Sequence, residues 1–197
     1  MNRIFLNFIK SKYLSLLVLF FACTGFIAAF YLTYEKIEIL KNPNKIINCN
    51  INPFLNCDTV MKSSYAEFFG IPWSLFGVAG YCACLLLALF LLDNYKLNKY
   101  ISWILTLGSF MAFVLSLYFM ILSAYIIKVF CPWCILSAIS SSNIFFTILT
   151  INIKENNYKL QVDYYKNLLK KNYNLYFIFF FYLILSMVMA YPFIYGL

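Results

Sequence analysis

The chain has 197 residues, of which 64% are hydrophobic and only 11% are charged, and its mean hydropathy is +0.81. A soluble domain carries about 25% charged residues, so this composition excludes an ordinary soluble domain and predicts an integral membrane protein with several spanning helices. The absence of histidine excludes His-based acid–base catalysis and His-ligated metal or haem, and the net charge of +8 does not indicate nucleic-acid binding, because the basic residues flank apolar segments.

The first predicted span covers Tyr13 to Tyr34 and follows a short basic start with Arg3, Lys10 and Lys12. Its apolar stretch is longer than the apolar region of a cleaved signal peptide, which is about 7–15 residues. We therefore expect a helix that is retained in the protein.

The longest predicted loop runs over residues 35–70 and carries Cys49 and Cys57, eight residues apart. Two cysteines in such a loop form either a static disulfide or a mobile redox pair. The segment Ser63-Ser64-Tyr65-Ala66-Glu67 places a serine ahead of a glutamate, which predicts a short capped helix. Aromatic residues in and directly after this segment could dip into the membrane surface; they are Tyr65, Phe68 and Phe69.

Three further spans are predicted at residues 71–92, 101–127 and 132–153. A basic segment at 154–172 is expected to lie on cytoplasmic lipid headgroups, and a fifth transmembrane helix is expected within 173–197. Three cysteines fall inside predicted spans and are expected to be small buried residues without redox function; they are Cys23, Cys82 and Cys84.

The fourth span opens with Cys131-Pro132-Trp133-Cys134. Proline suits the first turn of a helix, so Cys131 is expected at or just before the helix start and Cys134 one turn inside it. Free N–H groups at a helix start favour a thiolate, and two thiols in a Cys-x-x-Cys motif can make and break a disulfide. The motif therefore predicts a redox-active pair, and the alternative is two inert thiols in an apolar helix.

The distribution of Lys and Arg predicts the orientation, because cytoplasmic segments carry the excess of positive charge. With the N-terminus inside, ten of the fifteen basic residues are cytoplasmic and five are outside. Lys36, Lys41, Lys45, Lys62 and Lys128 are the five outer ones. Both cysteine pairs then lie on the periplasmic or extracytoplasmic side of the cytoplasmic (inner) membrane, where disulfide chemistry is permitted.

Over about residues 10–153, the chain resembles the vitamin K epoxide reductase (VKOR) family, and specifically its bacterial homologues. Four features in order carry the resemblance: the spacing of Cys49 and Cys57, Ser63 six residues later, the stretch from Phe69 to Gly77 at the start of the second span, and the motif from Cys131 to Cys134. The resemblance implies an all-α fold, a four-helix transmembrane bundle around a quinone, to which we expect the fifth helix to be added.

The resemblance also implies a function, quinone-dependent thiol–disulfide oxidation that supports disulfide bond formation. A separate thioredoxin-like (DsbA-like) protein would deliver electrons to Cys49 and Cys57, Cys57 would exchange with Cys131, and Cys134 would face ubiquinone or menaquinone in the membrane. Ser63 is a possible supporting residue. No metal is expected.

Two positions depart from the vertebrate pattern of this family: Trp73 stands in place of an asparagine that contacts the quinone, and Ala138 in place of a tyrosine. Both departures disfavour an epoxide-reducing role and leave simple quinone reduction intact. Aromatic side chains that could flank a planar ring, or else simply pack in the core, are Trp73, Phe76, Tyr81, Phe113, Phe119 and Trp133.

Three alternatives remain open at this point. The protein could be a quinone or vitamin K epoxide reductase driven by a thiol reductant, since the sequence does not fix the direction of electron flow. It could be a non-enzymatic membrane protein whose four thiols bind Cu(I) or Zn. It could also be a structural subunit with static disulfides.

Overall fold

The computed structural model describes residues 3–42, 49, 55–93, 98–154 and 181–191, and from residue 12 onward it also describes their side chains except that of Lys154. In chain order the elements are α1 (Arg3–Lys41), α2 (Cys57–Lys62), the 3-10 turn η1 (Ser64–Ala66), β1 (Glu67–Phe68), β2 (Ile71–Pro72), α3 (Trp73–Leu92), α4 (Lys99–Leu122), the π turn η2 (Ser123–Ile127) and α5 (Pro132–Lys154). A further helix covers Phe181–Tyr191.

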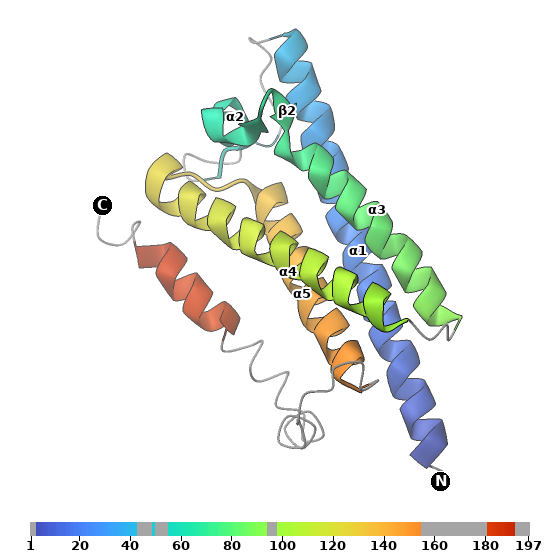
Figure 1. The fold of residues 1–197 in the computed structure, drawn as a ribbon. Coiled ribbons are helices and arrows are strands. Elements are labelled where there is room, and N and C mark those ends of the chain that lie inside the picture. Colours follow the sequence, from blue (N-terminus) through green and yellow to red (C-terminus); the bar gives the residue numbers. More distant parts are fainter. Residues whose placement is uncertain (1–2, 43–48, 50–54, 94–97, 155–180, 192–197) are drawn as a thin grey trace.

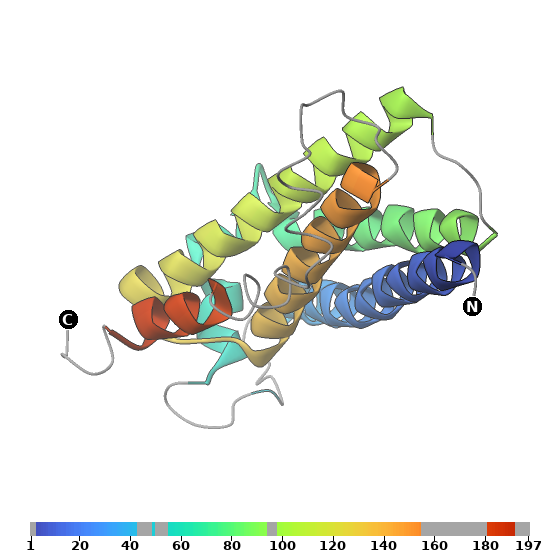
Figure 2. The ribbon, with the colours of Figure 1, turned by 90° about the horizontal axis from the view of Figure 1, so that it is seen from below.

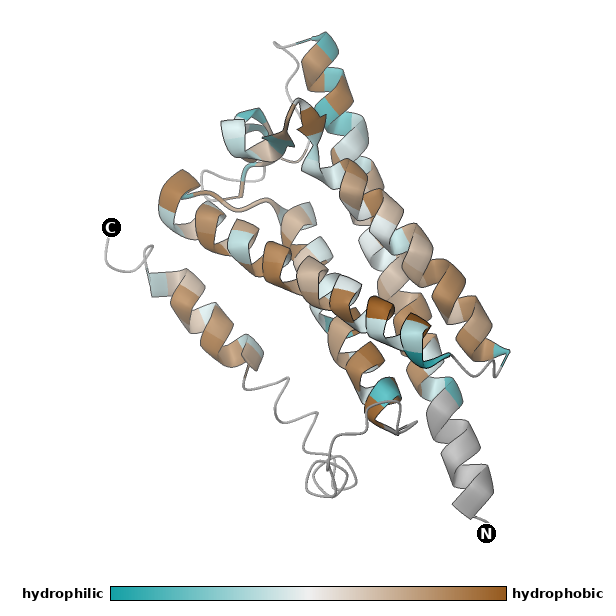
Figure 3. Ribbon diagram, in the orientation of Figure 1, coloured by the Kyte–Doolittle hydropathy of each residue, from teal (hydrophilic) through white to brown (hydrophobic). Residues whose placement is uncertain are grey.

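Among the described residues, four helical segments are long and apolar enough to cross a membrane: Lys12–Lys41, Trp73–Leu92, Lys99–Ile127 and Pro132–Ile153. They confirm the predicted all-α membrane bundle. The helices are brown along most of their length in Figure 3, and teal residues gather at the C-terminal end of α1, on α2 and at the turn that follows α3. Large apolar side chains such as Ile104, Leu107 and Met187 are exposed at the surface of the chain, as expected for helices that face lipid.

The bundle is held together mainly by α1, which packs along both α3 and α5, while α4 packs on α5 (Figures 1 and 2). Small residues at the crossing points, such as Ala22, Ala29 and Ala88, let the helices approach closely. Gly25 is the tightest case, because a methyl group at this position would overlap the ring of Tyr81. The larger core members are Val18, Tyr81, Leu87, Leu91, Ile144, Ile148 and Ile151.

The first helix is longer than predicted, since α1 continues through Lys41 instead of ending near Tyr34. The extra turns carry Glu35 and Lys36, and both side chains are buried, although the sequence predicted a polar loop here. Lys36 is covered because α2 and the β1–β2 hairpin fold back against α1, where its ammonium group meets Met61 and Glu67; Figure 1 shows these elements beside the upper part of α1.

The loop after α1 also contains a short α-helix, α2, that was not predicted. Asn56 caps α2 by accepting a hydrogen bond from the backbone N–H of Thr59 at 3.1 Å, and Ser63 ends the helix by donating to the carbonyl of Val60 at 2.7 Å. The short helix predicted over residues 63–67 is present only as the 3-10 turn η1 at Ser64–Ala66: Ser63 precedes it without a side-chain capping bond, and Glu67 already belongs to β1. Gly70, with φ of +80°, makes the hairpin turn.

The helix at residues 181–191 lies against α4 and α5. Tyr182 accepts a hydrogen bond from Asn143 at 2.8 Å, and Tyr125 donates to the carbonyl of Val188 at 3.0 Å. These eleven residues rise about 16 Å, roughly half the apolar thickness of a bilayer. The rest of the predicted fifth span and the basic linker at 155–172 lie outside the described residues.

Candidate active site

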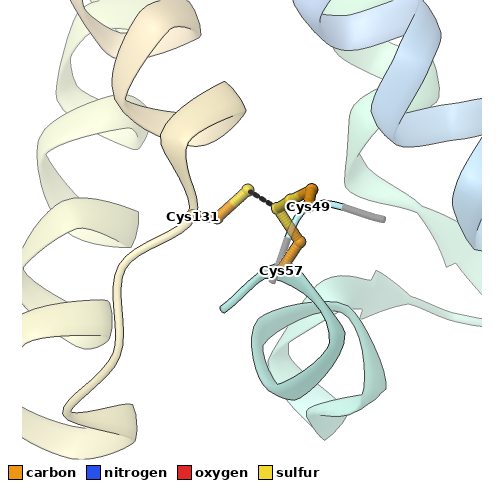
Figure 4. Close-up of side chains that lie close together, drawn as sticks. All are labelled: Cys49, Cys57 and Cys131. Carbon is orange, nitrogen blue, oxygen red and sulfur yellow. Dashed lines mark hydrogen bonds between the residues drawn. A yellow bond between two sulfur atoms is a disulfide. The ribbon is translucent and has the colours of Figure 1, made fainter. Parts of the chain in front are cut away.

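Three of the four predicted redox cysteines meet where α2 lies beside the start of α5 (Figure 4). Cys57 is the first residue of α2 and forms a disulfide with Cys49, with a Cα–Cα distance of 5.7 Å. Cys131 precedes α5, and its sulfur lies 3.2 Å from the sulfur of Cys57, although 74 residues separate the two in sequence. A free thiol is thus in contact with a disulfide sulfur, as thiol–disulfide exchange requires.

A backbone bridge sets this contact. Leu55 and Phe130 form an isolated parallel bridge, in which the N–H of Asn56 donates to the carbonyl of Phe130 at 2.9 Å. The bridge lies one or two residues before Cys57 on one side and directly before Cys131 on the other. The two cysteines are therefore held in register by main-chain atoms.

The start of α5 shapes the chemistry of Cys131. Pro132 is the first residue of the helix, and the carbonyl of Cys131 accepts from the N–H of Ile135 at 3.0 Å, so Cys131 occupies the capping position. The Cys134 thiol and the N–H groups of Cys134 and Trp133 donate hydrogen bonds to the Cys131 sulfur. They hold the pKa of the Cys131 thiol below its ordinary value, although burial opposes this effect. Cys131 is thereby favoured as a thiolate.

The sulfur atoms lie in a dry environment. Cys57 is 0% exposed, Cys131 1% and Cys49 8%, and Ile39 and Met61 complete the apolar cluster around them. The three sulfurs lie within 4.8 Å of one another, which is close enough to share a metal ion in the reduced protein. With Cys49 and Cys57 joined in a disulfide, only Cys131 of these three offers a thiolate.

A cavity of about 510 Å³ begins beside the cysteines and runs between α1, α3, α4 and α5. Cys134 lies on its wall, and most of the other lining groups are apolar. Tyr81 and Ser137 add a polar end: the Tyr81 hydroxyl donates to the Ser137 carbonyl at 2.7 Å and lies 2.9 Å from the Ser137 hydroxyl. An apolar slot of this size with a few polar groups is typical of sites for small molecules. It fits a planar quinone ring next to Cys134.

The aromatic candidates divide between this cavity and other places. Trp73, Phe76, Tyr81 and Phe119 line the cavity, as does Ser63. Phe113 is outside it, because its ring stacks on Phe145 at 5.2 Å and meets Phe181 of the last helix. Trp133 is also outside: its ring packs on Tyr31 at 4.6 Å, beside the cysteine cluster.

The prediction that the three cysteines within the spans are buried is wrong. Cys23 and Cys82 are exposed on the outer faces of α1 and α3, and Cys84 is partly buried and lines the cavity. Residues on a spanning helix can face lipid as readily as the core, and an all-apolar helix gives no periodic signal that distinguishes the two faces.

Lys36 is a site residue that the sequence did not reveal. It lines the cavity, and its ammonium group donates to the carbonyl of Met61 at 2.5 Å and pairs with Glu67 at 2.7 Å. In the sequence it is one of several basic residues near the end of an apolar segment, where the ordinary interpretation is a solvated charge. The nearest signal is its place two residues beyond the predicted end of the first span.

A family model described as the vitamin K epoxide reductase family matches residues 16–149, more than half of the chain. The chain therefore belongs to this family, as the sequence features predicted. Membership implies a multi-pass membrane oxidoreductase, which agrees with four spanning helices and with a disulfide in contact with a free thiol.

Proposed function

We propose that this member of the vitamin K epoxide reductase family is a quinone-dependent thiol–disulfide oxidoreductase. In this role it reoxidises a thioredoxin-like protein outside the cytoplasm and passes the electrons to membrane quinone. The observation that carries the proposal is the 3.2 Å contact between the sulfur atoms of Cys57 and Cys131, which links the loop pair to the membrane pair. A protein that reduced quinone without a thiol partner would have no need of this contact.

The proposed cycle consists of two disulfide exchanges inside the protein. After the partner has reduced the Cys49–Cys57 disulfide, the Cys57 thiolate attacks Cys131 of a Cys131–Cys134 disulfide. The Cys57–Cys131 bond forms and Cys134 leaves as a thiolate. The Cys49 thiolate then attacks Cys57, which restores the Cys49–Cys57 disulfide and releases Cys131 as a thiolate.

The arrangement in the structure matches the end of these two exchanges. Cys49 and Cys57 are joined, whereas Cys131 and Cys134 are free thiols. The lowered pKa of Cys131 supports its role as the leaving group in the last step, because a thiol with a lower pKa leaves more readily. The two electrons from the partner then reside on the membrane pair.

The cavity would hold the electron acceptor. A quinone bound there would accept two electrons and two protons as Cys131 and Cys134 return to a disulfide. Cys134 lies on the cavity wall, where it can face such a ring, and the apolar walls exclude water from the reacting sulfurs. Trp73, Phe76 and Phe119 supply flat surfaces, and the Tyr81–Ser137 pair supplies hydrogen-bonding groups.

The partner in this proposal is a separate DsbA-like protein, and the site faces the periplasm or cell exterior. The excess of basic residues on the other side of the membrane supports this orientation. The partner would in turn oxidise secreted proteins.

Disulfide mapping in a Cys134→Ala variant tests the proposal. Without Cys134, the Cys131 thiolate can still attack Cys57 of the Cys49–Cys57 disulfide, which forms the Cys57–Cys131 bond and releases Cys49 as a thiolate. No membrane-side thiol is then present to resolve this bond, so a measurable fraction of the chain is expected to hold it. Mass spectrometry of non-reduced peptides from protein purified in mild detergent measures it. A chain that contains only the Cys49–Cys57 bond, with Cys131 as an inert thiol, would show that the Cys49–Cys57 disulfide is purely structural. That result would contradict the proposal.

A further inference from the structure

We propose that Lys36 is a positioning residue for the exchange between the two cysteine pairs: it holds α2 down so that Cys57 stays against Cys131. The inference rests on the proposed function, since it assigns a residue to the internal exchange step. Lys36 contacts no reacting sulfur atom in the described structure and acts through α2.

The surroundings of Lys36 are unusual for a lysine. The residue is only 5% exposed, and lysines are almost never fully buried unless they are paired. Its ammonium group meets two elements at once: it donates to the carbonyl of Met61 in α2 and forms an ion pair with Glu67 in β1. One side chain of α1 therefore ties down both α2 and the β1–β2 hairpin, which together form the cap beside this end of α1.

Two contacts at opposite ends of α2 hold this helix in place. The N–H of Asn56 bonds to Phe130 just before the helix begins, and Lys36 bonds to the carbonyl of Met61 in its last turn. Because α2 has only six residues, it is about 9 Å long and moves as one unit. A loss of the Lys36 contact therefore also changes the position of Cys57, the first residue of the helix.

The same geometry shows what the contact prevents. Cys49 and Cys57 are 8% and 0% exposed, so a protein partner cannot reach their disulfide while α2 lies in this position. Exchange with the partner requires α2 to lift, whereas exchange with Cys131 requires it to stay down. Removal of Lys36 is therefore expected to affect the two exchanges in opposite directions, which general damage to the fold would not do.

Lys62 offers a matched control within the same helix. It forms an ion pair with Asp58 at 2.9 Å, four residues earlier in α2, and its side chain is 39% exposed. This pair links α2 only to itself, and exposed ion pairs contribute little to stability. Lys62→Met therefore removes a charge and an ion pair from the cap without loosening its attachment to α1.

The first measurement compares Lys36→Met and Lys62→Met, each in the Cys134→Ala chain. The quantity is the ratio of the Cys57–Cys131 bond to the Cys49–Cys57 bond, from mass spectrometry of non-reduced peptides. Lys36→Met is expected to lower this ratio by about fivefold or more, because one lost contact of ordinary strength shifts an equilibrium by that factor. Lys62→Met is expected to leave it nearly unchanged.

The second measurement uses chains that retain Cys134 and follows reduction of the Cys49–Cys57 disulfide by reduced glutathione. Lys36→Met is expected to speed this reaction by about fivefold or more, since α2 spends more time lifted, and Lys62→Met is expected to leave its rate nearly unchanged. An unchanged ratio and an unchanged reduction rate in Lys36→Met would overturn the positioning role of Lys36.

Two further controls separate the possible failures. If Lys36→Met lacks the helical circular dichroism of the wild-type chain, Glu67→Gln decides, because it removes only the ion pair from a partly exposed position. The same two shifts, smaller in size, support the role, and their absence overturns it. If the Cys134→Ala parent itself forms no Cys57–Cys131 bond, the proposed function fails, and this inference fails with it.

Discussion

The Cys131 sulfur contacts two other sulfur atoms: the disulfide sulfur of Cys57 at 3.2 Å and the thiol of Cys134, which donates a hydrogen bond to it. These neighbours act in different ways. The Cys57 sulfur is the atom with which Cys131 can undergo thiol–disulfide exchange, whereas the Cys134 thiol stabilises the Cys131 thiolate. At the scale of single residues, the spacing of the Cys-x-x-Cys motif therefore affects reactivity directly, because it places the donor one turn along the helix.

Replacement of Cys134 by alanine is expected to raise the pKa of Cys131, since the Cys134 thiol is the main group that lowers it. At neutral pH less Cys131 is then a thiolate, so its alkylation by iodoacetamide slows and the pH profile of the rate moves to higher pH. The rate is measured by mass spectrometry at the Cys131 peptide, with Cys49 and Cys57 replaced by alanine in both chains. Identical pH profiles with and without Cys134 would contradict the assigned cause.

At the scale of elements, the packing of α1 against α3 depends on one position without a side chain. The ring of Tyr81 in α3 lies against the backbone of Gly25 in α1, and the Tyr81 hydroxyl reaches Ser137 in α5. Tyr81 thus connects three helices, and it meets α5 about one turn after Cys134. A glycine is required because the ring occupies the space that a Cβ would take.

Gly25→Ala is expected to destabilise the bundle by about 1–3 kcal/mol, as overpacking in a close-packed interior does. Gly108→Ala in α4 is the matched control, because no atom lies within 4 Å of the position that its Cβ would take. That variant is expected to be as stable as the wild type or slightly more stable, since alanine favours helix by about 1 kcal/mol over glycine. Thermal unfolding in detergent, followed by circular dichroism, compares the two; equal stability would show that Tyr81 has room to move.

At the scale of the whole molecule, the chemistry gathers at one end of the bundle. The hairpin, α2 and the start of α5 lie together there (Figure 1), and the turn after α3 lies at the other end. The hairpin presents Phe69, which is 91% exposed, at its tip. The two ends should therefore face different compartments.

A membrane-impermeant maleimide tests this orientation in whole cells. In a chain whose native cysteines are replaced by alanine, Phe69→Cys is expected to react from outside. Asp93→Cys, in the exposed turn after α3, is expected to react only after the membrane has been permeabilised. The positive-inside bias of ten basic residues against five is the reason for this expectation. The reverse labelling pattern would place the cysteine pairs in the cytoplasm and contradict the proposed partner.

Much of the fold and part of the site could be predicted from the sequence because they depend on local properties. A segment must be apolar over about 20 residues to lie in lipid, so the four spans are visible in the composition of each segment. The place of Cys131 just before α5 follows from Pro132, which fits only the first turn of a helix. Four cysteines in two pairs, with the family pattern around them, pointed to redox chemistry.

Only the tertiary structure decided which residues meet. The contact between Cys57 and Cys131 joins positions 74 residues apart, and it depends on a backbone bridge that no local pattern encodes. Phe119 lines the cavity while Phe113 packs toward the last helix, although both lie in the same uniformly apolar segment. Lys36 is buried because the cap folds over α1. In a chain whose helices are apolar on every face, hydropathy determines which segments enter the membrane, and only packing determines which way each side chain points.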